Sequence, residues 1–167
     1  ERVDEIREAH KLVLTTSSTM MFGHIETLDE RLMHLIQLRD VQAEKPDHSQ
    51  GFATFVPWPF QDENTVLKQT LGITNSVTPV EYIKMVAISR IVLNNFPNLQ
   101  ASWLTIGVPT AQVCLHGGAN DLGSIMIEEN VVSVAGATHN LDKNRMVKAI
   151  QQAGFTPQLR NQKYEYI

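Results

Sequence analysis

The chain has 167 residues, of which 43% are hydrophobic and 19% charged, and its formal net charge is −4. This is the length of one domain, and the composition excludes a disordered chain because it supplies enough apolar surface for a core. The excess of acidic residues and the lack of a basic stripe argue against a nucleic-acid partner. A single cysteine, Cys114, excludes an internal disulfide, a multi-cysteine zinc site and an iron–sulfur cluster held by cysteines of this chain alone.

Residues 91–120 contain no charged side chain, but Asn, Gln, Pro and Gly interrupt this stretch, so we do not expect it to span a membrane. Alternating charges stand at the start of the chain in place of a secretory leader, and we therefore expect a cytoplasmic protein. The chain begins with Glu1, and its first methionine is Met20. We expect it to be a piece of a longer polypeptide.

Taken in chain order, the apolar spacing first predicts an amphipathic helix over residues 1–13. An uncharged, β-branched run predicts a buried strand over 17–22, which ends at Gly23. Thr27 is followed three residues later by a glutamate, the pattern of a capping box. It predicts a helix over 28–43.

A second short apolar strand is predicted over residues 51–57, with its end set by Pro57 and Pro59. Residues 58–77 then form a long connection, which in compact domains is more often functional than not. The segment TPVE (78–81) combines an N-cap threonine, a proline at the first helical position and a glutamate three residues after the cap. A helix is therefore predicted to begin there.

The remaining pattern predicts a third strand over residues 101–106 and a short helix over 109–116. A fourth strand follows over 122–127, with a helical segment over 128–135. Asp142 is the expected N-cap of a last helix.

Every predicted strand is short, uncharged and apolar on both faces, and helical segments separate the strands along the chain. This pattern is typical of parallel sheets covered by helices. The predicted fold class is α/β, with four parallel βα units that form half of an eight-unit (β/α) barrel. Such a layer leaves open strand edges, which natural proteins cover or pair. We therefore expect a partner that completes the barrel.

In a parallel barrel the active site lies at the carboxyl ends of the strands. Rings, carboxylates and amides follow or border the predicted strands, in the segments GHIET (23–27), PWPFQ (57–61) and NDLGS (120–124), with Trp103 on the third strand. Trp103 itself lies in an apolar run and is expected in the core. These side chains predict a polar, ring-containing ligand.

Four segments resemble the C-terminal half of the cyclic dehypoxanthine futalosine synthases. These are radical S-adenosylmethionine enzymes of the futalosine route to menaquinone. The segments are TMMFGHIET (19–27), GFATFVPWPFQDENT (51–65), NNFPNLQASW (94–103) and GANDLGSIMIEENVVSVAGATH (118–139). The resemblance extends over essentially the whole chain. Two sibling families, aminofutalosine synthase and the FO synthase subunits, share parts of the pattern.

The resemblance implies an absent N-terminal half that carries a C-x-x-x-C-x-x-C motif and binds a [4Fe-4S] cluster. It further implies reductive cleavage of S-adenosylmethionine, hydrogen abstraction from dehypoxanthine futalosine by a 5′-deoxyadenosyl radical, and cyclisation. The family's strand-five motif G-x-I-x-G-x-x-E maps onto Thr19, Met21, Gly23 and Glu26. Thr19 stands where the motif has its first glycine, the residue that permits close approach of the backbone to the ligand. Met21 stands where the motif has isoleucine and keeps an apolar side chain there.

On this basis the expected cofactor-binding residues are Thr19, Met21, Gly23, Glu26, Pro57 and Trp58. The expected substrate-binding residues are His24, Phe60, Gln61, Asn120 and Asp121, and no catalytic residue is assigned. Each group also has a structural interpretation. Glu26 can support the following helix, the aromatic rings can serve loop packing, and Asn120 and Asp121 can form a local turn.

His24 and Glu26, with His116 or His139, would have the residue types of a two-histidine-one-carboxylate iron site. No supporting histidine spacing accompanies the pair, so no metal site is predicted. Without cluster ligands the chain alone is expected to be inactive. An alternative of another class is a non-catalytic assembly module, in which two copies of the chain associate through the open barrel face.

Overall fold

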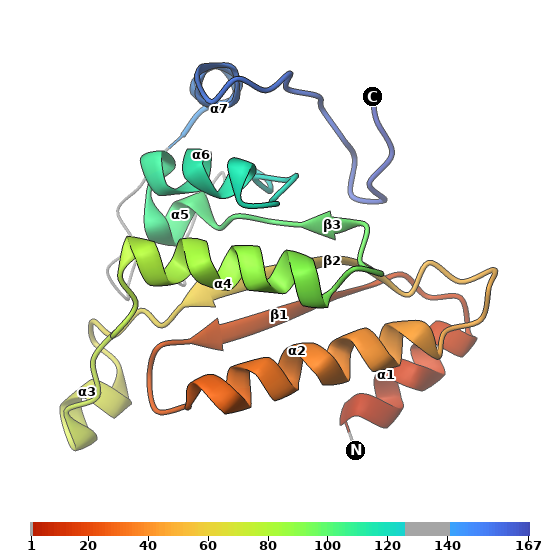
Figure 1. Cartoon of the computed structure of the whole chain (residues 1–167), viewed down its shortest axis with the longest axis horizontal. Helices are drawn as coiled ribbons and strands as arrows, with labels where there is room; N and C mark the ends of the chain where they lie inside the picture. Colours follow the sequence, from red (N-terminus) through yellow and green to blue (C-terminus); the bar gives the residue numbers. More distant parts are fainter. Residues whose placement is uncertain (1, 126–140) are drawn as a thin grey trace.

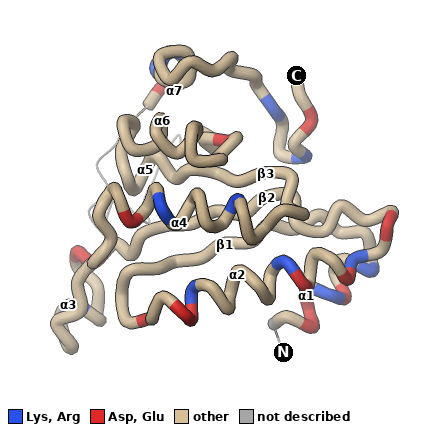
Figure 2. The backbone as a smooth tube through the Cα atoms, viewed as in Figure 1, with Lys and Arg blue, Asp and Glu red and all other residues tan. Residues whose placement is uncertain are grey.

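Three short parallel strands form the centre of the fold, in the order β1-β2-β3 (Figure 1). They are β1 (Thr16–Phe22), β2 (Phe52–Pro59) and β3 (Asn98–Leu99), and the computed structural model describes residues 2–125 and 141–167. β1 pairs with β2 over its whole length, whereas β3 pairs only opposite Thr54 and Phe55. Figure 2 shows β1 and β2 free of charged residues, as expected for strands buried beneath helices.

The helices are α1 (Arg2–Lys11), α2 (Leu28–Ala43), α3 (Val66–Leu71), α4 (Pro79–Val92), α5 (Trp103–Ile106), α6 (Val108–His116) and α7 (Lys143–Gln152). α2 and α4 lie along one face of the sheet (Figure 1). The predicted start signals are confirmed: Thr27, Thr78 and Asp142 each accept a hydrogen bond from the backbone N–H three residues later. The capping box at Thr27 is complete.

The core lies between the sheet and these two helices. Met20 and Phe22 of β1 are buried there, and Phe52 and Phe55 of β2 pack in the same layer. The helices contribute Leu35, Leu38, Val41, Tyr82, Met85 and Val86. Alternate β1 residues therefore point to opposite faces of the sheet, as the period of a strand requires.

The predicted end of the second strand is wrong, because β2 continues through both prolines to Pro59. The N–H of Gln100 donates to the carbonyl oxygen of Phe55, so the odd-numbered residues of β2 face β3. β3 ends at Leu99, opposite Phe55. Pro57 and Pro59 therefore lie where β3 no longer pairs, and their missing N–H groups cost the ladder no hydrogen bond.

The predicted strand over residues 101–106 is also wrong. Residues 98–99 form β3, and α5 (103–106) follows, closed by a hydrogen bond from the N–H of Gly107 to the carbonyl oxygen of Trp103. A short apolar run does not distinguish a strand from a buried helical turn. Here Trp103 is buried in the core, as predicted, but from a helix.

The predicted fourth strand is wrong for residues 122–125, which form no strand. A single parallel bridge joins Asp121 to Gln100, and Gly123 then turns with φ 77° while its N–H donates to Asp121 Oδ1. This local turn ends the extended conformation. Residues 126–127 and the predicted helix over 128–135 lie outside the described residues.

Tyr82 of α4 connects two parts of the fold through its buried hydroxyl. The hydroxyl donates to the carbonyl oxygen of Pro57, 2.8 Å away, and accepts from the backbone N–H of Ser102, 3.0 Å away. Its ring stacks on Phe22 at a centroid distance of 6.0 Å. Burial raises the pKa of Tyr82, so the hydroxyl keeps its proton and its role as a donor.

We expect Tyr82→Phe to lower the free energy of unfolding by about 1–3 kcal/mol, because the buried backbone groups of Pro57 and Ser102 lose their partner. Urea denaturation of the chain measures this loss. Tyr166→Phe is the matched control, since Tyr166 is 72% exposed and its variant should be nearly neutral. Equal stability of the two variants would contradict the role given to the Tyr82 hydroxyl.

Candidate functional site

The carboxyl ends of β1 and β2 lie side by side. Met21 is the pairing partner of Trp58, and the N–H of Phe60 donates to the carbonyl oxygen of Phe22 at 2.7 Å. The segments that follow the two strands therefore start side by side, at the carboxyl end of the sheet. The predicted residues from Thr19 to Glu26 and from Trp58 to Gln61 lie at or near this end.

Thr19, Met21 and Trp58 face away from α2 and α4. Thr19 and Met21 are exposed, and Trp58 is the one partly exposed residue in a strand that is otherwise buried. The neighbouring Pro57 is buried, and its carbonyl oxygen accepts from Tyr82 of α4. The side chains of Met21 and Trp58 thus provide an apolar surface on the sheet face that these helices leave free.

Gly23 makes the turn from β1 toward α2. Its φ is +93°, a conformation that favours glycine, and a Cβ added there would lie 2.2 Å from Cγ2 of Val77. The carbonyl oxygen of Gly23 accepts from both the N–H and the hydroxyl of Ser76. The segment that contains Ser76 and Val77 therefore holds the turn and leaves no room for a side chain at Gly23.

The carboxylate of Glu26 folds back onto this turn. Oε1 accepts from the N–H of Gly23 at 2.5 Å, and Oε2 accepts from the N–H of His24 at 3.1 Å. Arg31, in the first turn of α2, donates to Oε1 through Nε at 2.7 Å. Nδ1 of His24 lies in contact with Oε2 and accepts a hydrogen bond from the N–H of Ile25 at 2.8 Å. One carboxylate thus joins the turn, the imidazole and the helix.

Two opposing effects act on the pKa of Glu26. Burial alone raises it, but the N–H groups of Gly23 and His24, the residue's own N–H and Arg31 together lower the pKa to about 2. The side chains of Glu26 and Arg31 are each only 14% exposed. Glu26 is therefore an ionised carboxylate at neutral pH, held by backbone and guanidinium donors.

Phe60 and Gln61 follow β2 on the same edge. The rings of Phe60 and His24 lie 5.5 Å apart between centroids. Phe60 is buried, whereas the side-chain amide of Gln61 donates to the carbonyl oxygen of Pro59 at 3.1 Å. Phe60 therefore supports the imidazole ring, and Gln61 satisfies the backbone of its own loop.

The long connection after β2 contains a helix that was not predicted. α3 has no buried residue and extends away from the sheet near the end of β1 (Figure 1). The connection returns to the site through Ser76, which holds the carbonyl oxygen of Gly23. The sequence of this connection has few apolar residues at helical spacing, so periodicity did not predict α3.

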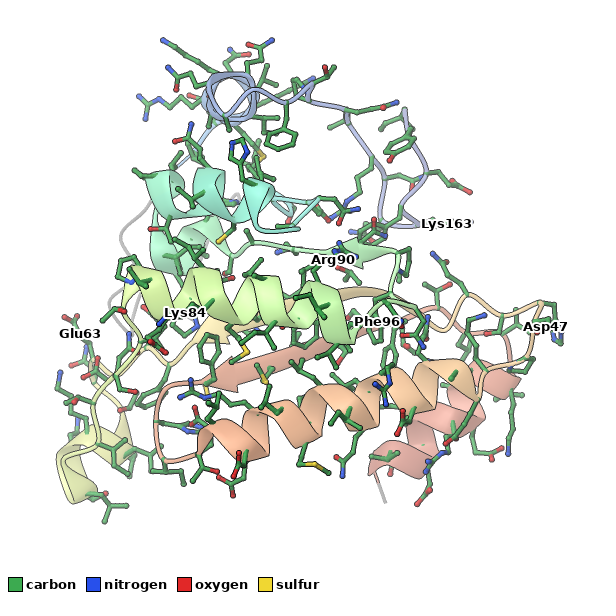
Figure 3. All side chains as sticks on the ribbon, viewed as in Figure 1. Asp47, Glu63, Lys84, Arg90, Phe96 and Lys163 are labelled. Atoms are coloured by element: carbon green, nitrogen blue, oxygen red, sulfur yellow. The ribbon has the colours of Figure 1, made fainter. Side chains whose placement is uncertain are left out.

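Asn120 and Asp121 do not lie with these residues. Oδ1 of Asn120 accepts from the N–H of Leu99 and from Arg90, and Asp121 Oδ2 forms an ion pair with Arg160 at 2.5 Å. Figure 3 places Arg90 at the side of α4 nearest β3, where it also donates to the carbonyl oxygen of Phe96. β3 pairs opposite Thr54 and Phe55, several residues before the carboxyl end of β2. Both side chains thus have partners that stabilise the fold.

Among residues 2–125 and 141–167, no group of three or more His, Cys, Asp or Glu side chains could hold a metal ion. The ring of His116 packs on Phe155 at 4.9 Å, and His139 lies outside the described residues. Cys114 is buried, and burial raises the pKa of its thiol to about 12. Within the same described part of the chain, no helix has the length and apolarity needed to cross a membrane.

Comparison with known proteins assigns the chain to a family. Residues 49–167 match the family described as the CofH/MqnC C-terminal region. The chain belongs to this family. The cyclic dehypoxanthine futalosine synthase of Streptomyces coelicolor is 46% identical over 168 residues, and that of Halalkalibacterium halodurans is 41% identical over 165 residues. The 5-amino-6-(D-ribitylamino)uracil–L-tyrosine 4-hydroxyphenyl transferase of Methanopyrus kandleri is 39% identical over 163 residues.

These three alignments cover 100%, 99% and 96% of the chain but only 40%, 42% and 43% of the respective relatives. The chain therefore spans about two fifths of the length of these members of the CofH/MqnC family. The matched segment begins before β2 and includes Trp58 and Phe60. The alignments with the relatives also cover β1 and its turn.

Three residues that shape this part of the fold were not predicted from the sequence: Arg31, Ser76 and Tyr82. Arg31 had a detectable signal, because an arginine in the first turn of a helix opposes the helix dipole and so indicates an acidic partner. Ser76 and Tyr82 gave none, since their partners are backbone groups distant in the sequence.

Proposed function

We propose that the chain is the C-terminal part of a radical S-adenosylmethionine enzyme that converts dehypoxanthine futalosine to its cyclic product in menaquinone biosynthesis. The observation that carries the proposal is that the predicted site residues Met21, Gly23, Glu26 and Trp58 lie together where β1 and β2 end. The 46% identity to a cyclic dehypoxanthine futalosine synthase supports this choice of reaction.

The chain does not itself fit the [4Fe-4S] cluster of such an enzyme. Three thiolates are needed for the family's cluster motif, and this sequence has only Cys114, whose thiol is buried. We therefore assign the cluster to the rest of the polypeptide. The chain's residues fit the organic ligands better, because Met21 and Trp58 offer an apolar surface beside polar groups at a strand end.

In the proposed enzyme, S-adenosylmethionine supplies the radical that starts the reaction, and this chain orients the reactants. Met21 and Trp58 would contact the flat rings of the ligands, such as the adenine of S-adenosylmethionine. Glu26 and Arg31 keep the β1 turn in one conformation, and Phe60 supports His24. A turn held this firmly keeps its groups in place during the reaction without reorganisation.

We further propose that the polypeptide absent here completes a (β/α) barrel by pairing with the free edge of β1. The N–H of Thr16 donates to the carbonyl oxygen of Gly51, and the carbonyl oxygen of Phe22 accepts from the N–H of Phe60, both on the side of β2. The backbone groups of the residues between Thr16 and Phe22 therefore alternate between β2 and the free edge of β1. The N–H groups of Thr19 and Met21 therefore point to this edge, where the backbone of Thr19 also forms a hydrogen bond with His34 of α2. The relatives have the additional length that such a partner needs.

Amide hydrogen exchange tests this pairing. In the chain alone, the amides of Thr19 and Met21 should exchange about tenfold or more faster than those of Ser18 and Met20, which face β2. In the full-length protein all four should be protected. Fast exchange at Thr19 in the full-length protein contradicts the pairing. Protection in the chain alone, with a doubled mass by light scattering, instead supports the homodimer alternative.

Turnover by the full-length protein tests the reaction. After anaerobic reconstitution with iron and sulfide, we expect dehypoxanthine futalosine, S-adenosylmethionine and a reductant to yield the cyclic product, detected by mass spectrometry. The chain alone, treated identically, is the control and should form neither product nor 5′-deoxyadenosine. Formation of 5′-deoxyadenosine by the chain alone would contradict the assignment of the cluster.

A second candidate is the transfer reaction for which the Methanopyrus kandleri relative is named. Its 39% identity over 96% of the chain supports this possibility. The same reconstituted protein would then act on 5-amino-6-(D-ribitylamino)uracil and L-tyrosine and leave dehypoxanthine futalosine unchanged. Aminofutalosine synthase activity is tested in parallel with that enzyme's substrate.

A further inference from the structure

The face of the sheet that α2 and α4 leave free changes in character along the strands. Its paired residues are Met21 and Trp58 at the carboxyl end, and Ser17 and Thr54 near the amino end. At about 3.3 Å per residue, these two pairs lie about 13 Å apart. The apolar surface of the proposed site therefore gives way to hydroxyl groups toward the amino end of the same face.

Residues 160–166, the C-terminal hairpin, cover the amino end of this face. After α7 the chain returns toward the amino ends of the strands (Figure 1), and an antiparallel bridge between Arg160 and Tyr166 closes the hairpin. Arg160 forms an ion pair with Asp121 at 2.5 Å, and Cζ of its guanidinium lies 3.8 Å from the ring centroid of Tyr164. These contacts fix the hairpin against the sheet.

A cavity of about 360 Å³ lies between the sheet and the C-terminal hairpin. Pockets for small ligands have volumes of about 300–1,000 Å³, so the cavity is large enough for part of a ligand. Side chains that bear a hydroxyl or an amide predominate among its described lining residues, and they include Ser17, Thr54, Gln100 and Tyr164. Tyr164 of the hairpin also contacts Thr54 of β2. The cavity is thus built from both the sheet and the hairpin.

The lining of the cavity has balanced charge. Among the described residues that line it, Arg160 alone is charged, and its ion pair with Asp121 balances that charge. Burial raises the pKa of Tyr164, so its hydroxyl keeps its proton at neutral pH. Hydroxyl and amide side chains each donate and accept hydrogen bonds. Such a lining favours a neutral group with several hydroxyls over an anion or a cation.

The position of the cavity selects the part of the ligand that it would bind. Val56 lines the cavity and precedes Trp58 by two residues, about 7 Å along the strand. A ligand whose flat ring contacts Met21 and Trp58 therefore places its adjoining group over the cavity. In S-adenosylmethionine that group is a ribose, and the futalosine-type substrate also carries a sugar.

We propose that this cavity binds the sugar hydroxyls of a ligand held at Met21 and Trp58, and that Gln100 and Tyr164 are among the residues that donate to or accept from them. The inference rests on the proposed function for the identity of the ligand, which is either S-adenosylmethionine or dehypoxanthine futalosine. It gives the C-terminal hairpin a part in the site, although the hairpin is distant from β1 and β2 in the sequence.

Two substitutions test the cavity, each with a control of the same kind. Tyr164→Phe removes the hydroxyl and keeps the ring beside Arg160, and its control is Tyr166→Phe, at a residue that is 72% exposed. Gln100→Leu removes the amide at similar size, and its control is Gln69→Leu on the exposed helix α3. We expect each cavity variant to weaken binding of one of the two ligands about tenfold, the effect of one lost hydrogen bond. Both controls should bind like the wild type.

The measurement is isothermal titration of the reconstituted full-length protein with S-adenosylmethionine and, separately, with dehypoxanthine futalosine. The ligand whose affinity falls is the one whose sugar occupies the cavity. Unchanged affinities in both cavity variants, in a protein whose wild type binds both ligands, overturn the inference and leave the proposed function intact. This is also the result expected if side chains of the absent polypeptide fill the cavity.

An equal fall in the control variants likewise overturns the inference, because the loss would then not arise in the cavity. A wild type that binds neither ligand instead overturns the proposed function. Melting temperatures confirm that each variant is folded.

Discussion

Replacing Gly23 by alanine should destabilise the chain by about 3 kcal/mol, one of the two largest effects that we expect from a single substitution. Its φ of +93° disfavours any side chain, and the added Cβ would lie 2.2 Å from Cγ2 of Val77. The turn would have to move, and the N–H that binds Glu26 and the carbonyl oxygen that binds Ser76 would move with it. Urea denaturation measures the loss.

Gly72→Ala is the matched control. Gly72 also has a positive φ, +67°, but an added Cβ there meets nothing within 4 Å. Its variant should therefore lose only the backbone contribution of about 1 kcal/mol. Combining Gly23→Ala with Val77→Ala should recover part of the larger loss, because the clash disappears while the strain at φ remains. Equal losses in the two single variants would show that the contact with Val77 has no energetic weight.

Loss of the Glu26 charge is the second large effect. We expect Glu26→Gln to lower the free energy of unfolding at pH 7 by about 2–3 kcal/mol, because a carboxylate held by two backbone N–H groups and Arg31 becomes a neutral amide. The amide oxygen can still accept hydrogen bonds. The NH2 group of the amide, however, would face the guanidinium of Arg31 or the backbone N–H of His24, which are donors too. Denaturation of both proteins at several pH values measures the difference.

The pH dependence has a defined sign. The pKa of Glu26 is lower in the folded chain, about 2, than its ordinary value of 4.5, so its contribution is complete above pH 4.5. As the pH falls from 4.5 toward 2, the unfolded chain takes up the proton first, and the contribution disappears. The gap between wild type and Glu26→Gln should close over this window. Glu63→Gln, which removes an exposed charge near α3 (Figure 3), is the control and should show no comparable gap.

Local signals in the sequence predicted the elements that position the site. The capping box at Thr27 and the TPVE segment at 78–81 identified the starts of α2 and α4 because each satisfies its own orphan backbone donors through residues three positions away. The uncharged run before Gly23 likewise identified β1. These signals depend on neighbours in the chain, so they can be read without knowing the fold.

Elements whose conformation depends on distant contacts were not predicted correctly. The two prolines of β2 suggested a strand end, but they are tolerated because β3 stops pairing before them. The apolar run at 101–106 suggested a strand, yet the N–H of Ser102 bonds to the hydroxyl of Tyr82, and a helical turn follows. Which backbone groups must pair within the sheet is known only once the strands are assembled.

The sequence by itself therefore determined the α/β class, the helix starts, and the glycine and glutamate that follow β1, because short-range hydrogen bonding and side-chain periodicity specify them. Only the tertiary structure decided that Glu26 bonds to Arg31 and His24, that Ser76 holds Gly23, and that Asn120 and Asp121 stabilise a different part of the sheet. The physical reason is that a carboxylate binds whichever donors the folded chain brings within hydrogen-bond distance. Sequence spacing does not specify those donors when they come from separate elements.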